Sequence, residues 1–505
     1  MVTWEWAIAV GKGGPRARND GGYLAQLRRE APARRGRRSD YNPAPVSAET
    51  SVEPTYKEGG PPAAATLRRD LRAMLGDAAA FSVMVGVGET YVPAFALAAG
   101  LGAVTAGLVA TLPMLAGAAL QLATPSGVAR LGSYRRWVVA CAIVQALSFL
   151  PLVIGAARAG ISEAWLFGAM AAYWGAGMAT SPAWNAWVGA LVPRERRAHF
   201  FAHRSRLSQV ALLLAILSAA VILEGGDAAR RPLAAFALLF AVAALSRLAS
   251  AAFLARQSEP AGLAGGQRRL SPQGVWVVLR GTDARGVLLY LLGMQAAVYL
   301  CAPYFTPYML GPLGLSYGGY MALTAAAFAS RIALLPALGH WAHARGSRAL
   351  FRVGALGIVP LPALWLVSDD FLYLLGLQLV AGAAWAALEL ATLMSFFETL
   401  EDRDRASVLT AFNFANTVAI AVGALGGAVA FRAFESAPEV YPLLFLGSSF
   451  ARLLALLLLP KPSPATHVPE EVALRTLAVR PSAGAIQRPV LPTLDGSDED
   501  FAAGE

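Results

Sequence analysis

The sequence predicts an all-α polytopic membrane protein with twelve transmembrane helices, arranged as two six-helix bundles. Three observations support this fold class: the composition, a series of long apolar runs, and arginines that concentrate in every second loop. Hydrophobic residues make up 56% of the chain and charged residues 15%, whereas ordinary soluble domains contain about 25% charged residues. The mean hydropathy is +0.51. We therefore do not expect a soluble core.

The apolar runs are long enough to cross a hydrocarbon core of about 30 Å at about 1.5 Å of helix per residue. They predict spans near 74–98, 102–125, 136–157, 164–193, 206–224, 232–255, 285–310, 316–339, 349–368, 371–398, 406–431 and 440–460. A more polar stretch separates the first six spans from the last six. The expected organisation is an N-terminal bundle over 67–255, a central cytoplasmic loop over 256–284 and a C-terminal bundle over 285–460.

The two ends of the chain differ from this pattern. Residues 1–66 are basic and rich in Pro and Gly, and residues 461–505 are polar and end in the acidic segment DGSDEDFAAGE. Neither stretch contains a long series of apolar residues at helical or strand spacing, so we expect two disordered tails.

Charge sets the expected orientation. The fourth span is followed by RERRAHFFAHRSR, which we interpret as a basic exit loop. Basic residues also follow the other even-numbered spans, at Arg130, Arg135, Arg136, Arg268, Arg269, Arg280, Arg345, Arg348, Arg403 and Arg405. The loops on the other side hold only Arg158, Arg230, Arg231 and Arg432. By the positive-inside rule, the even-numbered loops and both termini are predicted to be cytoplasmic.

The two halves also repeat each other weakly. RLGSYRRW after the second span matches ARGSRALF after the eighth, which makes Gly132 and Gly346 equivalent. Arg247 and Arg452 occupy matching places late in the sixth and twelfth spans. Parallel six-helix repeats of this kind are typical of secondary transporters.

Over roughly residues 70–460 the sequence resembles the major facilitator superfamily. Its loop signature G-x-x-x-D-R-x-G-R-[RK] is matched in part by PSGVARLGSYRR and GHWAHARGSR, with Ala129 and His343 at the two Asp positions. The stretch SPAWNAWVGALVPRERRAHFFAHR also looks like a segment of bacterial members. The resemblance implies a multi-pass protein of the bacterial inner membrane. It assigns to cytoplasmic gate loops the residues Arg130, Gly132, Arg136, Arg197, Arg204, Gly339, Gly346, Arg348 and Arg405.

Ionisable residues within the spans are the leading candidates for chemistry, because each costs about 2.5–3.5 kcal/mol to insert. Glu89 in the first span is expected to bind a proton or a cationic group of a substrate, with a structural hydrogen bond or salt bridge as the alternative. Glu389 in the tenth span is the second candidate carboxylate. Arg331 in the eighth span could pair with Glu389 or hold an anionic substrate group.

Neutral polar and aromatic residues complete the predicted pathway. They lie in the fourth, seventh, tenth and eleventh spans, at Trp174, Trp184, Asn185, Gln295, Tyr299, Trp385, Asn413 and Asn416. Trp174 and Trp184 share a helical face with Asn185 by their spacing. A mid-span Trp can stack on a flat or amphipathic substrate.

These features predict a secondary transporter of a small solute that works by alternating access and is coupled to protons. The alternatives are a lipid or amphiphile translocase of the same fold and an uncoupled facilitator; a membrane-embedded enzyme or sensor is less favoured. The sequence contains no phosphate-binding G-x-x-x-x-G-K-[ST] loop. We expect no cofactor, no metal and no nucleic-acid partner, and we expect the protein to be a monomer in the lipid bilayer.

Overall fold

The computed structural model describes residues 64–459 apart from 193, 260–283, 400–401 and 435–438. For some helical residues, among them Arg197, His343 and Arg405, it describes the backbone and not the side chain. The chain divides into two units, Met1–Lys57 and Glu58–Glu505, and every described helix belongs to the second. The predicted tails and the central loop therefore lie outside the described residues except at their edges.

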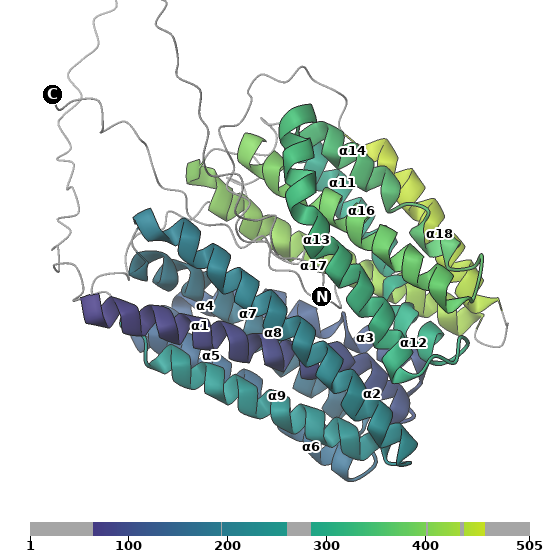
Figure 1. The fold of residues 1–505 in the computed structure, drawn as a ribbon, viewed down its shortest axis with the longest axis horizontal. Coiled ribbons are helices and arrows are strands. Elements are labelled where there is room, and N and C mark those ends of the chain that lie inside the picture. Colours follow the sequence, from purple (N-terminus) through teal and green to yellow (C-terminus); the bar gives the residue numbers. More distant parts are fainter. Residues whose placement is uncertain (1–63, 193, 260–283, 400–401, 435–438, 460–505) are drawn as a thin grey trace, which may run out of the picture. The chain divides into compact units, whose positions relative to one another are not determined.

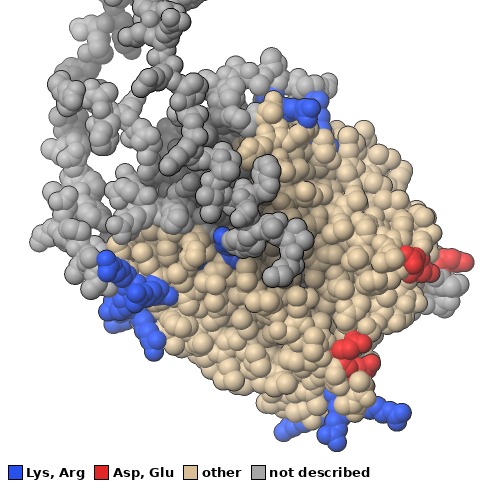
Figure 2. Space-filling model, in the orientation of Figure 1, with Lys and Arg blue, Asp and Glu red and all other residues tan. Residues whose placement is uncertain are grey.

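Every regular element in the described ranges is helical. Within the described residues, eleven stretches are long and apolar enough to cross a membrane. The fourth predicted span is α7 (Glu163–Leu191), which has 29 residues but carries several Trp, Gly, Ser and Thr residues that lower its hydropathy. Figure 2 shows charged side chains gathered near the helix ends, with uncharged surface between them. The predicted fold class, an all-α polytopic membrane protein, is confirmed.

Three of the six spans in the first half consist of more than one helical piece. The first span contains α1 (Ala64–Val87), the 3-10 helix η2 (Glu89–Tyr91) and α2 (Val92–Ala98). The next spans contain α3 (Gly102–Val109), α4 (Pro113–Leu131), α5 (Tyr134–Leu147), α6 (Leu150–Ala157) and α7, followed by α8 (Arg194–Ala228) and α9 (Pro232–Ala255). Proline stands in the first turn of α4, α6 and α9, where its missing N–H leaves no hydrogen bond unmade.

The second half is divided in a similar way. The seventh span contains α11 (Ala284–Tyr299), the 3-10 helix η3 (Ala302–Tyr304) and α12 (Phe305–Leu310). The later spans contain α13 (Tyr317–Arg345), α14 (Ser347–Gly357), α15 (Leu361–Leu364), α16 (Phe371–Thr399), α17 (Asp402–Ala433) and α18 (Val440–Ala455), which continues into η4 (Leu456–Leu458). The first and seventh spans thus both contain a 3-10 turn followed by a short helix.

Helix packing follows one pattern in both halves, which form two groups in Figure 1. In the first half α1 contacts α8 and α9, α7 contacts α4 and α5, and α5 contacts α9. In the second half α11 contacts α17 and α18, α16 contacts α13 and α14, and α15 contacts α18. The same five pairings of spans therefore occur twice, as expected of a structural repeat.

The two halves meet at one end of the spans, where α12 contacts α2 and α3 and the first turn of α13 contacts the last turns of α8. In addition, α17 contacts α3 and α4. Glu224 Oε2 on α8 accepts a hydrogen bond of 2.8 Å from the backbone N–H of Gly318 on α13. The rings of Phe236 and Tyr317 lie edge to face with centroids 5.8 Å apart. This is the end predicted to face away from the cytoplasm.

One predicted boundary is wrong. The basic segment after the fourth span was expected to be an exit loop, but the structure places it in the first turns of α8, which begins at Arg194. Arg204 and Gly339, both assigned to gate loops, likewise lie inside α8 and α13. Hydropathy marks where a chain leaves the apolar layer, whereas a helix continues through polar residues as long as its backbone hydrogen bonds continue.

Both signature-loop glycines adopt backbone conformations with positive φ. Gly132 ends α4 with φ 61° and ψ 17°, and Gly346 follows α13 with φ 86° and ψ 153°. The first conformation is left-handed helical, and the second lies near a region that is populated essentially by glycine. The sharp connections after the second and eighth spans depend on these two residues.

We predict that Gly346→Ala lowers the free energy of unfolding by about 1–3 kcal/mol, because alanine must adopt a strained conformation there. Thermal or denaturant unfolding of the purified protein in detergent measures the change. Gly168→Ala is the matched control, since a Cβ at Gly168 in α7 meets no atom within 4 Å. That control is expected to be neutral or stabilising. Equal stability of the two variants would contradict the prediction.

Candidate functional site

Glu89 lies at the break in the first span. It opens the 3-10 turn η2 between α1 and α2, and only 4% of it is exposed. The preceding Gly88 allows this turn to approach the third and sixth spans closely, because a Cβ there would lie 2.7 Å from both Ala243 Cβ and the Phe149 ring. Discontinuous spans of this kind place polar groups near the midplane of transporters.

A tyrosine from the fourth span holds the Glu89 carboxylate. The Tyr173 hydroxyl donates a hydrogen bond of 2.5 Å to Glu89 Oε2. Tyr173 is itself surrounded by rings, with Phe149 at 5.3 Å and Trp174 at 5.7 Å between centroids, both edge to face. A buried polar group is costly unless it is hydrogen-bonded, so Tyr173 stabilises Glu89 in these apolar surroundings by satisfying one of its carboxyl oxygens.

The break in the seventh span is the structural counterpart of this turn. Tyr91 in η2 donates a hydrogen bond of 2.7 Å to the Ile216 carbonyl of the fifth span. Tyr304 in η3 donates one of 3.5 Å to the Ala424 carbonyl of the eleventh span. Both tyrosines are fully buried. The two turns therefore use the same contact, with tyrosine as their last residue.

Arg331 and Glu389 form a buried ion pair in the second half. Arg331 Nε donates a hydrogen bond of 3.2 Å to Glu389 Oε2, and Nη2 contacts Oε1. Arg331 is 9% exposed and Glu389 is 7% exposed. Arg331 lies roughly 20 Å along α13 from the end where the halves meet, at about 1.5 Å per residue. Of the two roles that the sequence left open for Arg331, pairing with Glu389 or holding an anionic substrate group, the structure shows the first contact.

The remaining pathway candidates differ in burial. Trp174, Gln295, Tyr299 and Asn416 are buried, and Trp184, Trp385 and Asn413 are half-buried. Asn185 is exposed, so it does not share the buried environment of Trp174. Among the described residues, Gln295 Nε2 and Asn416 Oδ1 are buried without a hydrogen-bond partner. Such unpaired groups are costly, and a bound solute or water could satisfy them.

A buried polar network joins four spans of the first half. Asp77 on α1 accepts hydrogen bonds from Arg204 Nη2 at 3.3 Å and from Ser250 Oγ at 2.7 Å. Arg247 donates to Ser250 Oγ at 2.6 Å and to Gln145 Oε1 at 2.8 Å. The Arg204 guanidinium also lies 4.5 Å from the centre of the Trp184 ring. Arg204 therefore packs inside its bundle and does not lie in a loop.

The other gate-loop candidates lie around the predicted cytoplasmic connections. Arg130 in the last turn of α4, Arg136 in α5 and Arg348 in α14 are exposed. The side chains of Arg197 and Arg405 lie outside the described residues. Instead of the missing signature acid, Glu259 binds this region. It accepts from the backbone N–H of Tyr134 at 2.6 Å at the start of α5.

Sequence reasoning missed two residues of these sites. Asp77 lies inside the predicted first span, so the rule that intramembrane charges need a role should have identified it. Nothing in the sequence marked Tyr173 as a site residue, because tyrosine is common in membrane spans. Only the fold shows that its hydroxyl lies at Glu89. No group of three or more His, Cys, Asp or Glu side chains suited to a metal ion occurs among the described residues.

Comparisons with known proteins identify the fold. No protein-family model and no curated protein matches the sequence. A crystal structure of a point mutant of the nucleoside transporter NupG matches with TM-score 0.61 and 12% identity, covering 77% of this chain and 99% of that chain. The chain has the fold of the major facilitator superfamily. A crystal structure of the major facilitator superfamily transporter FucP, in the outward conformation, matches with TM-score 0.51 and 14% identity, covering 77% of this chain and 97% of that chain.

We predict that Arg331→Met lowers the free energy of unfolding by about 3–5 kcal/mol, because it leaves the Glu389 carboxylate buried without its partner. The double variant Arg331→Met with Glu389→Leu is expected to recover most of the loss, since both charges are then absent. Unfolding in detergent compares the two. A double variant as unstable as the single one would show that the pair is not the cause.

Proposed function

We propose that this protein is a secondary transporter that moves a small solute across the membrane by alternating access and couples this movement to protons at Glu89. The fold supports transport, because both superfamily structures described above are transporters by their titles. The substrate of NupG is not carried over at 12% identity. Proton coupling rests on one observation, the position of Glu89.

The repeat supports a functional role for this carboxylate. The turn Glu89–Tyr91 in the first span corresponds to Ala302–Tyr304 in the seventh, so alanine stands where the first half has Glu89. The turn therefore forms without an acid. A structural requirement for Glu89 would apply to both copies, whereas a proton site needs only one.

The contacts between the halves support alternating access. They lie at the end predicted to face away from the cytoplasm, where Glu224 on α8 binds the first turn of α13. With the predicted orientation, the described state is closed on the outside. Movement of one half against the other would then break these contacts and open the outer side.

We predict that Glu89→Gln abolishes substrate-driven proton flux, reducing it at least about tenfold, because the amide cannot take up and release a proton. Proteoliposomes with a trapped pH dye measure the flux while sugars, nucleosides, amino acids, organic acids, peptides and lipophilic cations are screened. Substrate exchange without net proton movement should persist in this variant.

The exposed Asp369→Asn in the loop before α16 is the matched control and should behave as wild type. Tyr173→Phe keeps the ring and removes the hydrogen bond to Glu89, so it should shift the pH dependence of flux without abolishing it. If Glu89→Gln and wild type move substrate and protons alike, proton coupling at this residue is wrong and the protein is a facilitator or uses another ion. No movement of any solute would instead favour the lipid translocase.

We also predict that Glu224→Ala shifts the population toward the state open on the outside. Loss of one exposed charge-assisted hydrogen bond of about 1 kcal/mol corresponds to an about fivefold change in the population ratio. Spin labels at the exposed positions Arg158 and Asp369, on the outer loops of opposite halves, report the distance between the halves.

The matched control is Glu439→Ala, because Glu439 is also exposed on that side and makes no side-chain cap of α18. The control should leave the distance distribution unchanged. A Glu224 variant with the wild-type distribution would show that this contact does not hold the outer side closed.

A further inference from the structure

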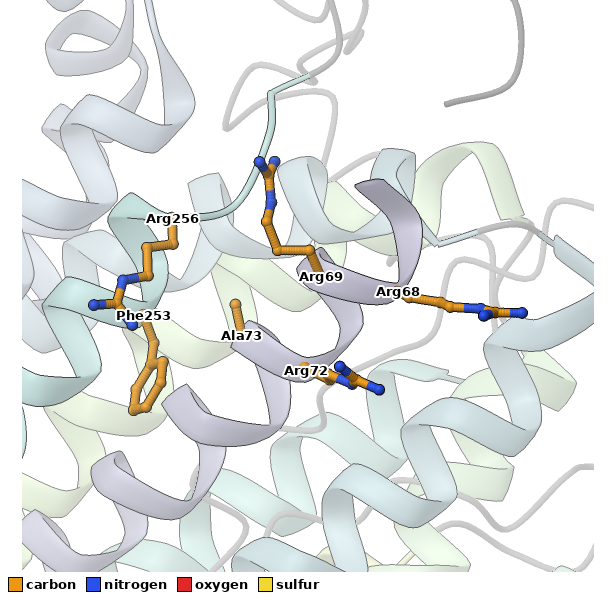
Figure 3. Close-up of a pocket in the computed structure, with 6 residues that line it drawn as sticks. All are labelled: Arg68, Arg69, Arg72, Ala73, Phe253 and Arg256. Carbon is orange, nitrogen blue, oxygen red and sulfur yellow. The ribbon is translucent and has the colours of Figure 1, made fainter. Parts of the chain in front are cut away.

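A short segment that follows α9 crosses the predicted cytoplasmic end of the first half, and we call its residues 257–259 the strap. Figure 3 shows this end of the molecule, where the chain leaves α9 after Arg256 and passes the first turns of α1 near Arg69. A Cβ on Gly76 would lie 2.8 Å from the Phe253 ring, so α1 and α9 pack directly against each other about one turn before the strap. The strap therefore begins from a fixed position.

The middle residue of the strap joins α1 to α7. The backbone N–H of Ser258 donates a hydrogen bond of 3.3 Å to Asp70 Oδ1, and the Ser258 hydroxyl contacts Oδ2. The Ser258 carbonyl accepts a hydrogen bond of 2.9 Å from the indole N–H of Trp187, which lies one turn before the end of α7 at Leu191. Asp70 and Trp187 are both buried. Ser258 thus links two side chains that their own helices hold in place.

The last residue of the strap caps α5. Glu259 Oε1 accepts hydrogen bonds from the backbone N–H groups of Tyr134 at 2.6 Å and Arg135 at 3.4 Å. Its Oε2 accepts one from the hydroxyl of Ser133, the N-cap residue of α5. The first N–H groups of a helix have no partner within it, and a carboxylate is favoured there. Arg135 also donates from Nη1 to the Gln257 carbonyl at 3.1 Å, so α5 is held at both ends of the strap.

The helix ends joined by the strap share an apolar cluster that is separate from the main core. Its members come from α1, α5, α7, α8 and α9 and include the buried residues Met74, Val138, Trp187, Phe200 and Leu254. Phe200 lies within residues 197–204 in the first turns of α8, which we call the gate segment because its two end residues are the predicted gate residues Arg197 and Arg204. Trp187 therefore connects the strap, through its N–H, to the cluster that holds the gate segment.

The first residue of the strap opposes docking. The Gln257 side chain is fully buried, and within the described ranges neither polar atom of its amide has a hydrogen-bond partner. A buried amide without partners is destabilising, whereas an apolar side chain of similar shape is not. The contacts of Ser258 and Glu259 therefore hold Gln257 in an unfavourable place, and methionine at this position should strengthen docking.

We propose that the strap stays docked throughout the transport cycle and positions the end of α7, so that the gate segment moves together with the whole first half. Ser258 and Glu259 are positioning residues in this arrangement, because they act through Trp187 and the helix ends. The four helices that the strap joins all belong to the first half. None of its contacts has to break when one half moves against the other. The proposal rests on the alternating access proposed above.

Hydrogen exchange of the full-length protein in detergent, measured by mass spectrometry, tests the positioning role. Glu259→Ala should raise the exchange rate of the backbone amides at the start of α5 on the order of tenfold. It should also raise exchange several-fold in the last turn of α7, because the strap then holds Trp187 less firmly. Gln257→Met should lower exchange at both places. The matched control is Arg256→Ala, since Arg256 is exposed beside the strap and makes none of the hydrogen bonds described above; it should exchange like wild type.

An unchanged last turn of α7 in Glu259→Ala would overturn the proposal, because Glu259 would then only cap α5. If Glu259→Ala does not fold, Glu259→Gln keeps the shape of the side chain and weakens the acceptor. This variant should show smaller increases at the same two places, and an increase confined to α5 would again contradict a positioning role.

Two further variants test whether the strap stays docked. In Glu224→Ala, which should favour the state open on the outside, exchange at the start of α5 should match wild type. Gln257→Met should leave the distance between the labels at Arg158 and Asp369 unchanged. Faster exchange in the first variant or a shifted distance in the second would show that the strap docks in one state only. If Glu224→Ala does not change the distance between the halves, the outer contact does not control access, and the Glu259 variants still decide whether the strap positions α7.

Discussion

The need to satisfy every charge inside an apolar helix bundle determines much of this structure. Glu89 is buried and accepts a hydrogen bond from Tyr173, Arg331 binds Glu389, and Asp77 binds Arg204 and Ser250. Each contact joins different spans, so each also fixes how its helices pack. Because an isolated charge in such a place would cost several kcal/mol, these side chains specify neighbours more strictly than the surrounding apolar residues do.

Comparison of the two halves distinguishes the features that both contain, which the fold requires, from the features that only one half contains. Both halves break their first span with a 3-10 turn that ends in a buried tyrosine, Tyr91 or Tyr304, bonded to a backbone carbonyl. Both also end their second span at a glycine with positive φ. These shared features maintain the architecture. Among the described residues, Glu89, the Asp77–Arg204 pair and the Arg331–Glu389 pair each occur in one half only, so the shared architecture does not require them.

The sequence predicted the fold class and the long fourth span, and it gave pairing with Glu389 as one of two alternatives for Arg331, because hydropathy and the cost of intramembrane charge act on every residue locally. It did not predict the break at Glu89, because glycine and proline residues such as Gly88 and Pro93 are also found in spans that form one continuous helix. It placed Arg204 in a loop, although this arginine packs on Asp77 and Trp184. That contact joins residues far apart in the chain, and only tertiary packing shows it.

The location of the ion pairs bears on how the halves could move. Arg204–Asp77 lies within the first half and Arg331–Glu389 within the second, and the Glu89–Tyr173 bond also stays within one half. Breaking a buried pair by removing its partner costs about 3–5 kcal/mol, so a motion that separated such partners would be slow. A rocking motion leaves these contacts intact and breaks the exposed bond between Glu224 and Gly318, which water can replace. The charges thus favour movement of each half as a rigid body, with the main change at the contact surface between them.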